Sequence, residues 1–210
     1  MLEITRLTVE HLAQGCVTDC PAPRIGFAVQ SDRNDAELTD AILQVGDWNV
    51  HLPQDGQTGT AYKGPALLPF TTYGVRLTVT DNTGAAAEAE TTFETGRMET
   101  PWRGQWISDP AFTFTEAKVS PVPMVFRKTI ETAKPIARAR LYATAMGIYE
   151  VELNGQKLGQ QYFAPGFTSY KSYLQYQTYD VTELLTGHDT LTVTVAGGWA
   201  VGSFVFTRKN

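Results

Sequence analysis

Side chains able to catalyse a reaction are scattered through this chain rather than gathered in a motif. His11, His51 and His188 are far apart, and no G-x-S-x-G sequence supplies a nucleophile for any of them. Acid–base hydrolysis needs two carboxyl groups that face each other across a cleft. Glu150 and Glu152 instead alternate with apolar residues, so both are expected on the solvated face of one strand. The sequence therefore predicts no catalytic site in this chain.

Candidate metal ligands are equally few. Cys16 and Cys20 are four positions apart, and two thiols alone cannot complete a tetrahedral zinc site. A short-loop disulfide would require an oxidising compartment, so we expect two reduced thiols. Asp81 and Asn82 could bind calcium, but their loop lacks the further oxygen ligands of an EF-hand. We expect no cofactor, and no motif supports calcium.

Aromatic side chains crowd the last fifty residues. They can stack on the apolar faces of sugar rings while polar neighbours bind the hydroxyl groups. They also dominate the cores of β-sandwiches, so packing alone explains most of them. Trp199 stands between Gly198 and Gly202, which predicts a tightly turned backbone and a ring that is buried or at a domain contact. The full set is Tyr162, Phe163, Phe167, Tyr170, Tyr173, Tyr176, Tyr179, Trp199, Phe204 and Phe206.

Composition excludes several classes of protein. The 210 residues carry 17 Lys and Arg against 22 Asp and Glu, a formal charge of -5, without a basic run. This balance argues against a nucleic-acid or anionic-membrane surface. No apolar stretch approaches the ~20 residues of a membrane span, and the first residues lack the features of a signal peptide, so we expect a cytoplasmic protein. The 18 Gly and 11 Pro that separate short apolar runs are typical of an all-β protein.

The first half is predicted to form about seven short strands. The clearest is Tyr73–Thr80, in which four apolar residues alternate with Gly, Arg and Thr. Asp81-Asn82-Thr83-Gly84 then predicts a turn, and 87–95 the partner strand. Seven strands in ~95 residues are typical of an immunoglobulin-like or fibronectin-type sandwich. Gly, Pro and charged residues between 96 and 104 indicate a domain boundary.

The second half restarts as further strands. The sequence predicts strands at 124–131, 136–145, 148–153, 173–179 and 190–195, with a hairpin at Asn154-Gly155. Residues 180–187 predict a capped helical turn. Arg138 and Arg140 could clamp a ligand, and an exposed strand face explains them equally well. The prediction is a second β-sandwich or jelly roll.

The motifs of the second half resemble the N-terminal β-domain of bacterial α-L-rhamnosidases. The resemblance rests on Gly147 to Tyr149, Asn154-Gly155, Pro165-Gly166-Phe167-Thr168-Ser169-Tyr170, Tyr179 to Thr182, and Gly198 to Gly202. In the first half, LTVEHL, AYKGPAL, the strand at Tyr73 and FETG are similar to the fibronectin-type domain that precedes it in these enzymes. Gly26-Phe27 departs from that pattern, where a Ser-Trp pair is common.

The resemblance implies an all-β fold in two domains. Residues 1–97 would form a fibronectin III or Ig-like sandwich. Residues 101–210 would form a jelly-roll or galactose-binding-like β-sandwich, incomplete at its C-terminus. The family removes terminal α-L-rhamnose from glycosides with inversion, using carboxyl groups on an (α/α)₆ barrel further along its chains. The resemblance thus implies a non-catalytic N-terminal region, whose partners would be that downstream catalytic domain and rhamnose-containing glycans.

Relatives that bind rhamnose through the second domain make four residues candidate sugar contacts: Arg138, Asn154, Tyr170 and Trp199. An incomplete sandwich would leave strand edges open, so self-association is also expected. Two alternatives stay open at this stage. One is a stand-alone carbohydrate-binding module, and the other is an Ig-like scaffold or adhesion protein.

Overall fold

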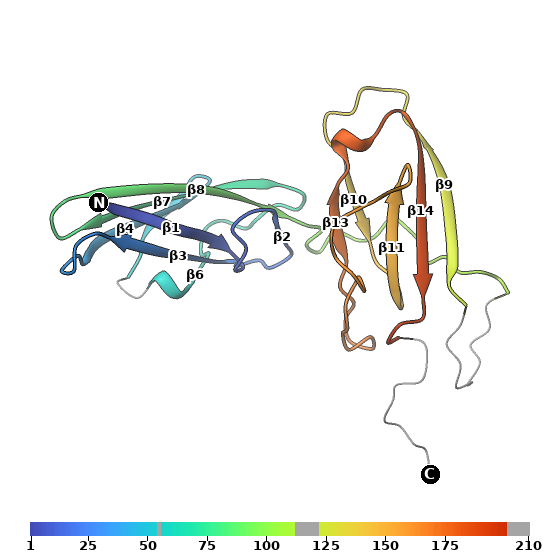
Figure 1. Cartoon of the computed structure of the whole chain (residues 1–210), viewed down its shortest axis with the longest axis horizontal. Coiled ribbons are helices and arrows are strands. Elements are labelled where there is room, and N and C mark those ends of the chain that lie inside the picture. Colours follow the sequence, from blue (N-terminus) through green and yellow to red (C-terminus); the bar gives the residue numbers. More distant parts are fainter. Residues whose placement is uncertain (54–55, 112–121, 201–210) are drawn as a thin grey trace, which may run out of the picture. The chain divides into compact units, whose positions relative to one another are not determined.

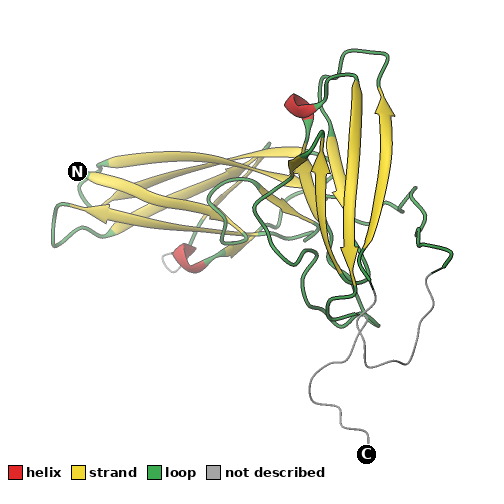
Figure 2. Cartoon of the chain, turned by 45° about the vertical axis from the view of Figure 1, so that its right-hand side comes forward, coloured by secondary structure: helices red, strands yellow, loops and turns green. Residues whose placement is uncertain are grey.

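The computed structural model describes residues 1–53, 56–111 and 122–200 (Figure 1). Two of the aromatic residues noted above, Phe204 and Phe206, lie outside these ranges, as does Gly202. The chain divides into two compact units, residues 1–105 (unit 1) and 106–210 (unit 2). The described part is all-β apart from two short 3-10 helices (Figure 2), which confirms the predicted fold class. No helix in it has the length and hydropathy to cross a membrane.

Unit 1 is a sandwich of two sheets. One has the strand order β1-β3-β6 and the other β2-β8-β7-β4-β5. The elements are β1 (Leu2–Val9), β2 (Cys16–Thr18), β3 (Arg24–Ser31), β4 (Leu38–Val45), β5 (Trp48–His51), η1 (Gly56–Thr58), β6 (Thr60–Ala61), β7 (Thr72–Asp81) and β8 (Ala86–Thr95). β2 pairs with β8 in parallel, whereas the other pairs in this unit are antiparallel.

The alternation predicted for β7 is present and places one face of this strand in the core of unit 1. Val75, Leu77 and Val79 are at most 1% exposed, while Arg76 between them is exposed. The expected turn follows, in which Gly84 has a φ of 82° and donates its N–H to the carbonyl of Asp81 over 3.0 Å. The Asp81 carboxylate accepts hydrogen bonds from Thr83 and Ala85, so it stabilises this turn. These bonds also hold the pKa of Asp81 below its usual value.

Unit 2 contains a four-stranded sheet, β12-β11-β14-β9, and a two-stranded sheet, β10-β13. Its elements are β9 (Met124–Glu131), β10 (Arg140–Ala143), β11 (Ile148–Leu153), β12 (Gln156–Lys157), β13 (Gln177–Asp180), η2 (Thr182–Leu184) and β14 (His188–Ala196). Side chains from both sheets share one core, with Tyr149, Val151 and Leu153 on β11 and Tyr179 on β13. Leu191, Val193 and Val195 of β14 pack against it but are only partly buried.

Two predicted strands of unit 2 are shorter than expected. The strand expected at 136–145 is limited to β10, because Ala139 donates its N–H to Thr182 Oγ1 and accepts from the N–H of Val181. The strand expected at 173–179 begins only at Gln177. Residues before it form a turn, in which the carbonyl of Ser169 accepts the N–H groups of Ser172 and Tyr173. The 180–187 helical turn is reduced to η2.

Candidate functional site

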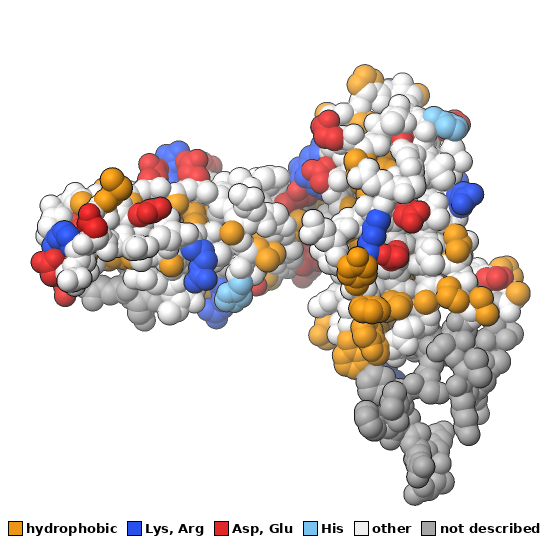
Figure 3. All heavy atoms as spheres, in the orientation of Figure 1, with side chains coloured by type: hydrophobic (Ala, Val, Ile, Leu, Met, Phe, Trp, Pro, Cys, Tyr) orange, Lys and Arg blue, Asp and Glu red, His pale blue; other side chains and the backbone are white. Residues whose placement is uncertain are grey.

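Three exposed aromatic rings and one half-buried ring, that of Tyr170, lie at the end of unit 2 where β14 ends and β11 begins. We call Phe163, Phe167, Tyr170 and Trp199 the aromatic surface. The Trp199 ring contacts Phe163 and Phe167 edge-on, with centroids 5.8 and 6.1 Å apart, and Phe167 contacts Tyr170 in the same way at 6.1 Å. Phe163 is 60%, Phe167 63% and Trp199 40% exposed. Figure 3 shows hydrophobic side chains gathered at this end of the unit.

Glycines allow the start of β11 and the end of β14, just before Trp199, to approach closely. Gly198 has a φ of 51°, and a Cβ there would lie 2.7 Å from Cγ2 of Ile148. A Cβ on Gly147 would clash with the carbonyl oxygen of Ala196. Only glycine permits this approach. The turn expected around Trp199 is therefore present, but its ring is not buried within the described part of the chain.

The four candidate sugar contacts fall into two places. Tyr170 and Trp199 both belong to the aromatic surface, joined through Phe167. Asn154 lies at the opposite end of β11, since Ile148 pairs with Ala196 and Leu153 with Leu191. At ~3.4 Å per residue, the five steps between these pairs separate the two ends by about 17 Å. The structure therefore does not bring the four residues into one site.

The side chain of Asn154 has a structural role. It has a φ of 54° in the Asn-Gly turn between β11 and β12, as predicted. Its Nδ2 donates to Oδ1 of Asp189 over 2.8 Å, and its Oδ1 accepts the N–H of Thr190 over 2.8 Å. The Asp189 side chain also accepts from Thr186 and from the N–H of Gly187. We call these residues, 154, 186, 187, 189 and 190, the Asn154 clasp. The bond from Asn154, above all, lowers the pKa of Asp189 to about 2.

Arg138 is exposed and lines an open hollow beside η2. Arg140, Asp180, Thr182 and Glu183 line the same hollow. Arg140 pairs with Asp180 over 2.7 Å, and Asp180 accepts the N–H and hydroxyl of Thr182. The Asp180 carboxylate and the Thr182 hydroxyl beside Arg138 are thus already engaged in holding η2.

A smaller pocket, missed by the sequence reasoning, lies on the outward face of the four-stranded sheet. Its volume is about 210 Å³. It is lined by Ile148, Tyr149, Glu150, Tyr162, Phe163, Thr194 and Ala196. We call it the sheet pocket. The alternation in β11 indicated an outward Glu150, but no local pattern could show that Tyr162 folds over it.

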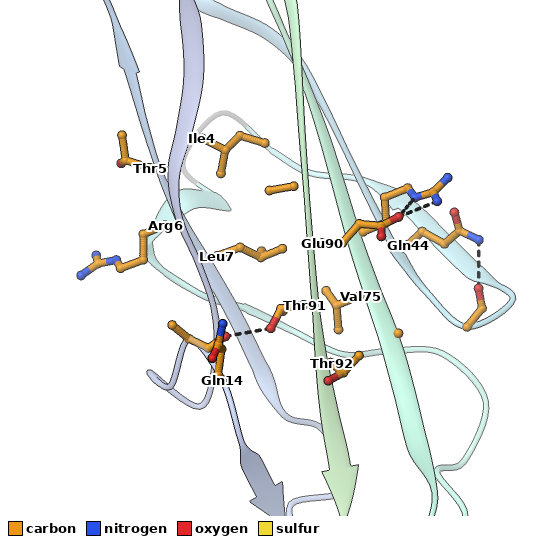
Figure 4. Close-up of a pocket in the computed structure, with 15 residues that line it drawn as sticks. Ile4, Thr5, Arg6, Leu7, Gln14, Gln44, Val75, Glu90, Thr91 and Thr92 are labelled. Carbon is orange, nitrogen blue, oxygen red and sulfur yellow. Dashed lines mark hydrogen bonds and ion pairs between the residues drawn. The ribbon is translucent and has the colours of Figure 1, made fainter.

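Unit 1 has a broader groove of about 770 Å³ between β1 and β8 (Figure 4). Ile4 and Leu7 point towards β8, while Arg6 points away. The polar groups around the groove already bond within the unit: Arg76 pairs with Glu90, and Thr91 donates to the carbonyl of Ala13 over 2.8 Å. The groove therefore offers no convergent set of polar groups for a ligand, and we assign it no site.

The remaining candidates are the two cysteines and the possible metal ligands. Cys16 is buried and Cys20 half-buried, and both are free thiols in this structure. Burial, with Glu10 nearby, raises the pKa of Cys16 to about 11. In the described residues, no three His, Cys, Asp or Glu side chains gather in a way that could hold a metal ion.

Family models match both units. Residues 4–99 match the model described as the Rha78A-like N-terminal immunoglobulin domain, and residues 134–210 match the alpha-L-rhamnosidase N-terminal domain. The alpha-L-rhamnosidase of Formosa agariphila is 35% identical over 116 residues, which are 52% of this chain and 12% of that protein. The enzyme of the same name from Streptomyces avermitilis is 51% identical over 71 residues, 33% of this chain and 7% of that protein. The chain thus matches only a small part of the length of these curated relatives.

Solved structures agree on the fold. The α-L-rhamnosidase of Aspergillus terreus superposes with a TM-score of 0.84 at 26% identity, covering 98% of this chain and 25% of that one. The enzyme from Dictyoglumus thermophilum gives a TM-score of 0.84 at 23% identity, covering 97% and 26%. Both family models match N-terminal domains, and they occur in order along most of the chain. Over most of its length, the chain therefore matches two successive N-terminal domains of α-L-rhamnosidases.

Proposed function

We propose that this chain is the N-terminal part of a glycoside hydrolase that removes terminal α-L-rhamnose by inverting hydrolysis. Its two β-domains would support a downstream catalytic domain and help to bind the glycan. The observation that carries the proposal is the succession of an Ig-like and a rhamnosidase-type N-terminal domain, both matched by family models. In inverting hydrolysis, one carboxylic acid protonates the leaving oxygen while a carboxylate activates water on the opposite face of the sugar. Those two groups would belong to the downstream domain.

Release of the aryl group from an aryl α-L-rhamnoside tests this proposal. We expect no release by the 210 residues alone, and release by a longer polypeptide that continues from them into a catalytic domain. Activity of the 210 residues alone would contradict the non-catalytic assignment. A longer polypeptide that is folded but inactive on every rhamnoside tried would contradict the proposed reaction.

The aromatic surface favours a second role, in which the chain binds a glycan by itself. Tyr170 and Trp199 are the two candidate contacts that belong to it, linked through Phe167, and exposed rings such as that of Trp199 suit the apolar faces of sugars. Calorimetric titration with rhamnose, with and without calcium, tests this role. Heat that disappears in a Trp199→Ala variant would support binding at the aromatic surface. Equal heat from the variant would place the sugar elsewhere.

A further inference from the structure

The turn between β11 and β12 has a chemical reactivity that its structural role does not require. Asn154 is the only asparagine in the sequence that a glycine follows. Because glycine has no side chain, its backbone nitrogen is accessible for attack on the amide carbon of the preceding asparagine. A Cβ on Gly155 would meet no atom beyond its chain neighbours within 4 Å, and both residues are exposed. Bulk therefore does not shield the reacting atoms from each other or from water.

The reaction open to this pair is deamidation. The backbone nitrogen of Gly155 bonds to Cγ of Asn154, and the side-chain nitrogen leaves as ammonia, which gives a five-membered succinimide ring. Water then opens the ring at one of its two carbonyl groups and leaves an aspartyl or isoaspartyl residue at position 154. One water is consumed and one ammonia released, with no oxidation or reduction. The new carboxyl group is ionised at neutral pH, so the chain gains one negative charge.

The Asn154 clasp opposes this reaction in the folded chain. Nδ2 of Asn154 donates to Asp189 and Oδ1 accepts the N–H of Thr190, each over 2.8 Å. The side chain must turn about its Cα–Cβ bond to bring Cγ against the nitrogen of Gly155, and that rotation breaks both hydrogen bonds. Asp189, whose pKa is about 2, is ionised at neutral pH and has no proton to give to the leaving nitrogen. The pair is therefore held in an unreactive conformation.

The product of the reaction cannot rebuild the clasp. A carboxylate at position 154 has no donor for Asp189, whose side chain is 0% exposed. Two carboxylates would then face each other where the amide and Asp189 now form a hydrogen bond, and like charges at that distance repel. We propose that Asn154-Gly155 is a self-modification site, which the folded clasp keeps unreacted and whose product, once formed in an opened clasp, prevents the clasp from closing again. Water is the only co-reactant.

The proposal is tested by following deamidation at position 154 by peptide mass spectrometry at neutral pH, in buffer and in urea. The rate in the folded chain equals the unfolded rate multiplied by the fraction of open clasp. Two hydrogen bonds, one of them to a carboxylate, should keep that fraction near one in ~30, so we expect reaction about 30-fold slower in buffer than in urea. Asn82, which threonine follows, should react more slowly than Asn154 in urea. Equal rates for Asn154 in buffer and in urea would overturn the protective role of the clasp.

A variant that loosens the clasp without changing the reacting pair sharpens this test. Thr186→Val removes a hydroxyl that donates to Asp189 over 2.8 Å, and should accelerate deamidation in the folded chain about fivefold. Thr144→Val is the matched control in the same unit, because Thr144 donates to the carbonyl of Gln175 over 2.7 Å, outside the clasp. In urea, both variants should react at the parental rate. Equal acceleration by the two variants in buffer would contradict control by the clasp.

The consequence of the reaction is tested with a chain that already has the product's charge. Asn154→Asp should lower the hydrogen-exchange protection of unit 2, and adding Asp189→Asn should restore part of it, because one of the two facing carboxylates is removed. Unchanged protection in Asn154→Asp, or no recovery in the double variant, would overturn the inference that the product keeps the clasp open.

Discussion

The Asn154 clasp makes a sharp prediction about unit 2. Asn154→Gly keeps a residue that adopts a φ of 54° without strain and removes the side-chain bonds to Asp189 and to the N–H of Thr190. If Asn154 were instead a free sugar contact, the same change would leave stability almost unaltered. The substitution therefore separates the structural role seen here from the binding role predicted from the sequence.

The expected loss of stability follows from the two 2.8 Å bonds of Asn154, since its bond to the carbonyl of Leu184 is long, at 3.5 Å. A hydrogen bond to a charged group contributes about 1.5–3 kcal/mol and one between neutral groups about 0.5–1.5 kcal/mol. Asn154 is itself exposed, so water can replace part of each bond. We expect the free energy of unfolding of unit 2 to fall by about 2–3 kcal/mol.

Native-state hydrogen exchange measures this loss unit by unit. The N–H of Thr190 should lose protection first, because its acceptor is removed, and the amides of β11 and β14 should follow. Asn82→Gly is the matched control in unit 1, where Asn82 Nδ2 donates to the carbonyl of Asp35 over 2.9 Å. It should lower the protection of unit 1 and leave unit 2 unchanged. If Asn154→Gly changed the stability of unit 2 by less than about 0.5 kcal/mol, the clasp would not be a stabilising element.

Three further predictions concern titration, thiol reactivity and association. The folded-state pKa of Asp189, about 2, lies below its usual value of 3.8, so its contribution to stability is present above pH ~4 and is lost as the pH falls towards 2. Urea midpoints of unit 2 measured across this range should therefore decrease more in the parent chain than in Asp189→Asn. Iodoacetamide at pH 8 should modify Cys20 well before Cys16, because burial raises the pKa of Cys16 to about 11. Mass spectrometry should show equal modification rates for the two thiols in denaturant. Faster modification of Cys16 than of Cys20 in the native chain would contradict its burial. Among the described residues, the two-stranded sheet β10-β13 and the edge strand β9 leave strand edges unpaired, so we propose that the chain self-associates. Light scattering should then show a molecular mass that increases with concentration. A strict monomer at about 100 µM would refute this proposal.

The elements that the sequence predicts best are those governed by local chemistry. The period-two pattern of β7 and the Asn-Gly hairpin at 154–155 depend on residues next to one another, and the structure confirms both. The strands predicted at 136–145 and 173–179 are shorter in the structure. A local turn at Ser169 precedes the second strand, whereas a bond to a distant residue lies at the start of the first. Ala139 bonds to Thr182, 43 positions away, and no local pattern reports that.

The roles of the candidate sugar contacts depend even more on residues that are distant in the sequence. An asparagine that stabilises a turn and an asparagine that binds a sugar cannot be distinguished in sequence, because both roles use the donor and acceptor of the side-chain amide. What decides for Asn154 is Asp189, 35 residues later, which becomes its neighbour only through the pairing of β11 with β14. Tyr170 and Trp199 were proposed as sugar contacts, and that role stays a prediction. Phe167, whose ring contacts both of theirs, could not be distinguished from a core residue in the sequence.

The polar side chains at one end of β11 are hydrogen-bonded within the unit, whereas the aromatic side chains at its other end are partly exposed. At one end, Asn154 and Asp189 use their hydrogen-bonding groups on each other and on the backbone, which makes the hairpin rigid. At the other end, Gly147 and Gly198 allow the strands to approach, and the rings of Phe163 and Trp199 are left partly exposed. A rigid hairpin fixes the register of β11 against β14, and that register places Glu150 beside Thr194 in the sheet pocket. Loss of the clasp in Asn154→Gly should therefore lower the hydrogen-exchange protection of the paired strands β11 and β14 as well as that of the hairpin.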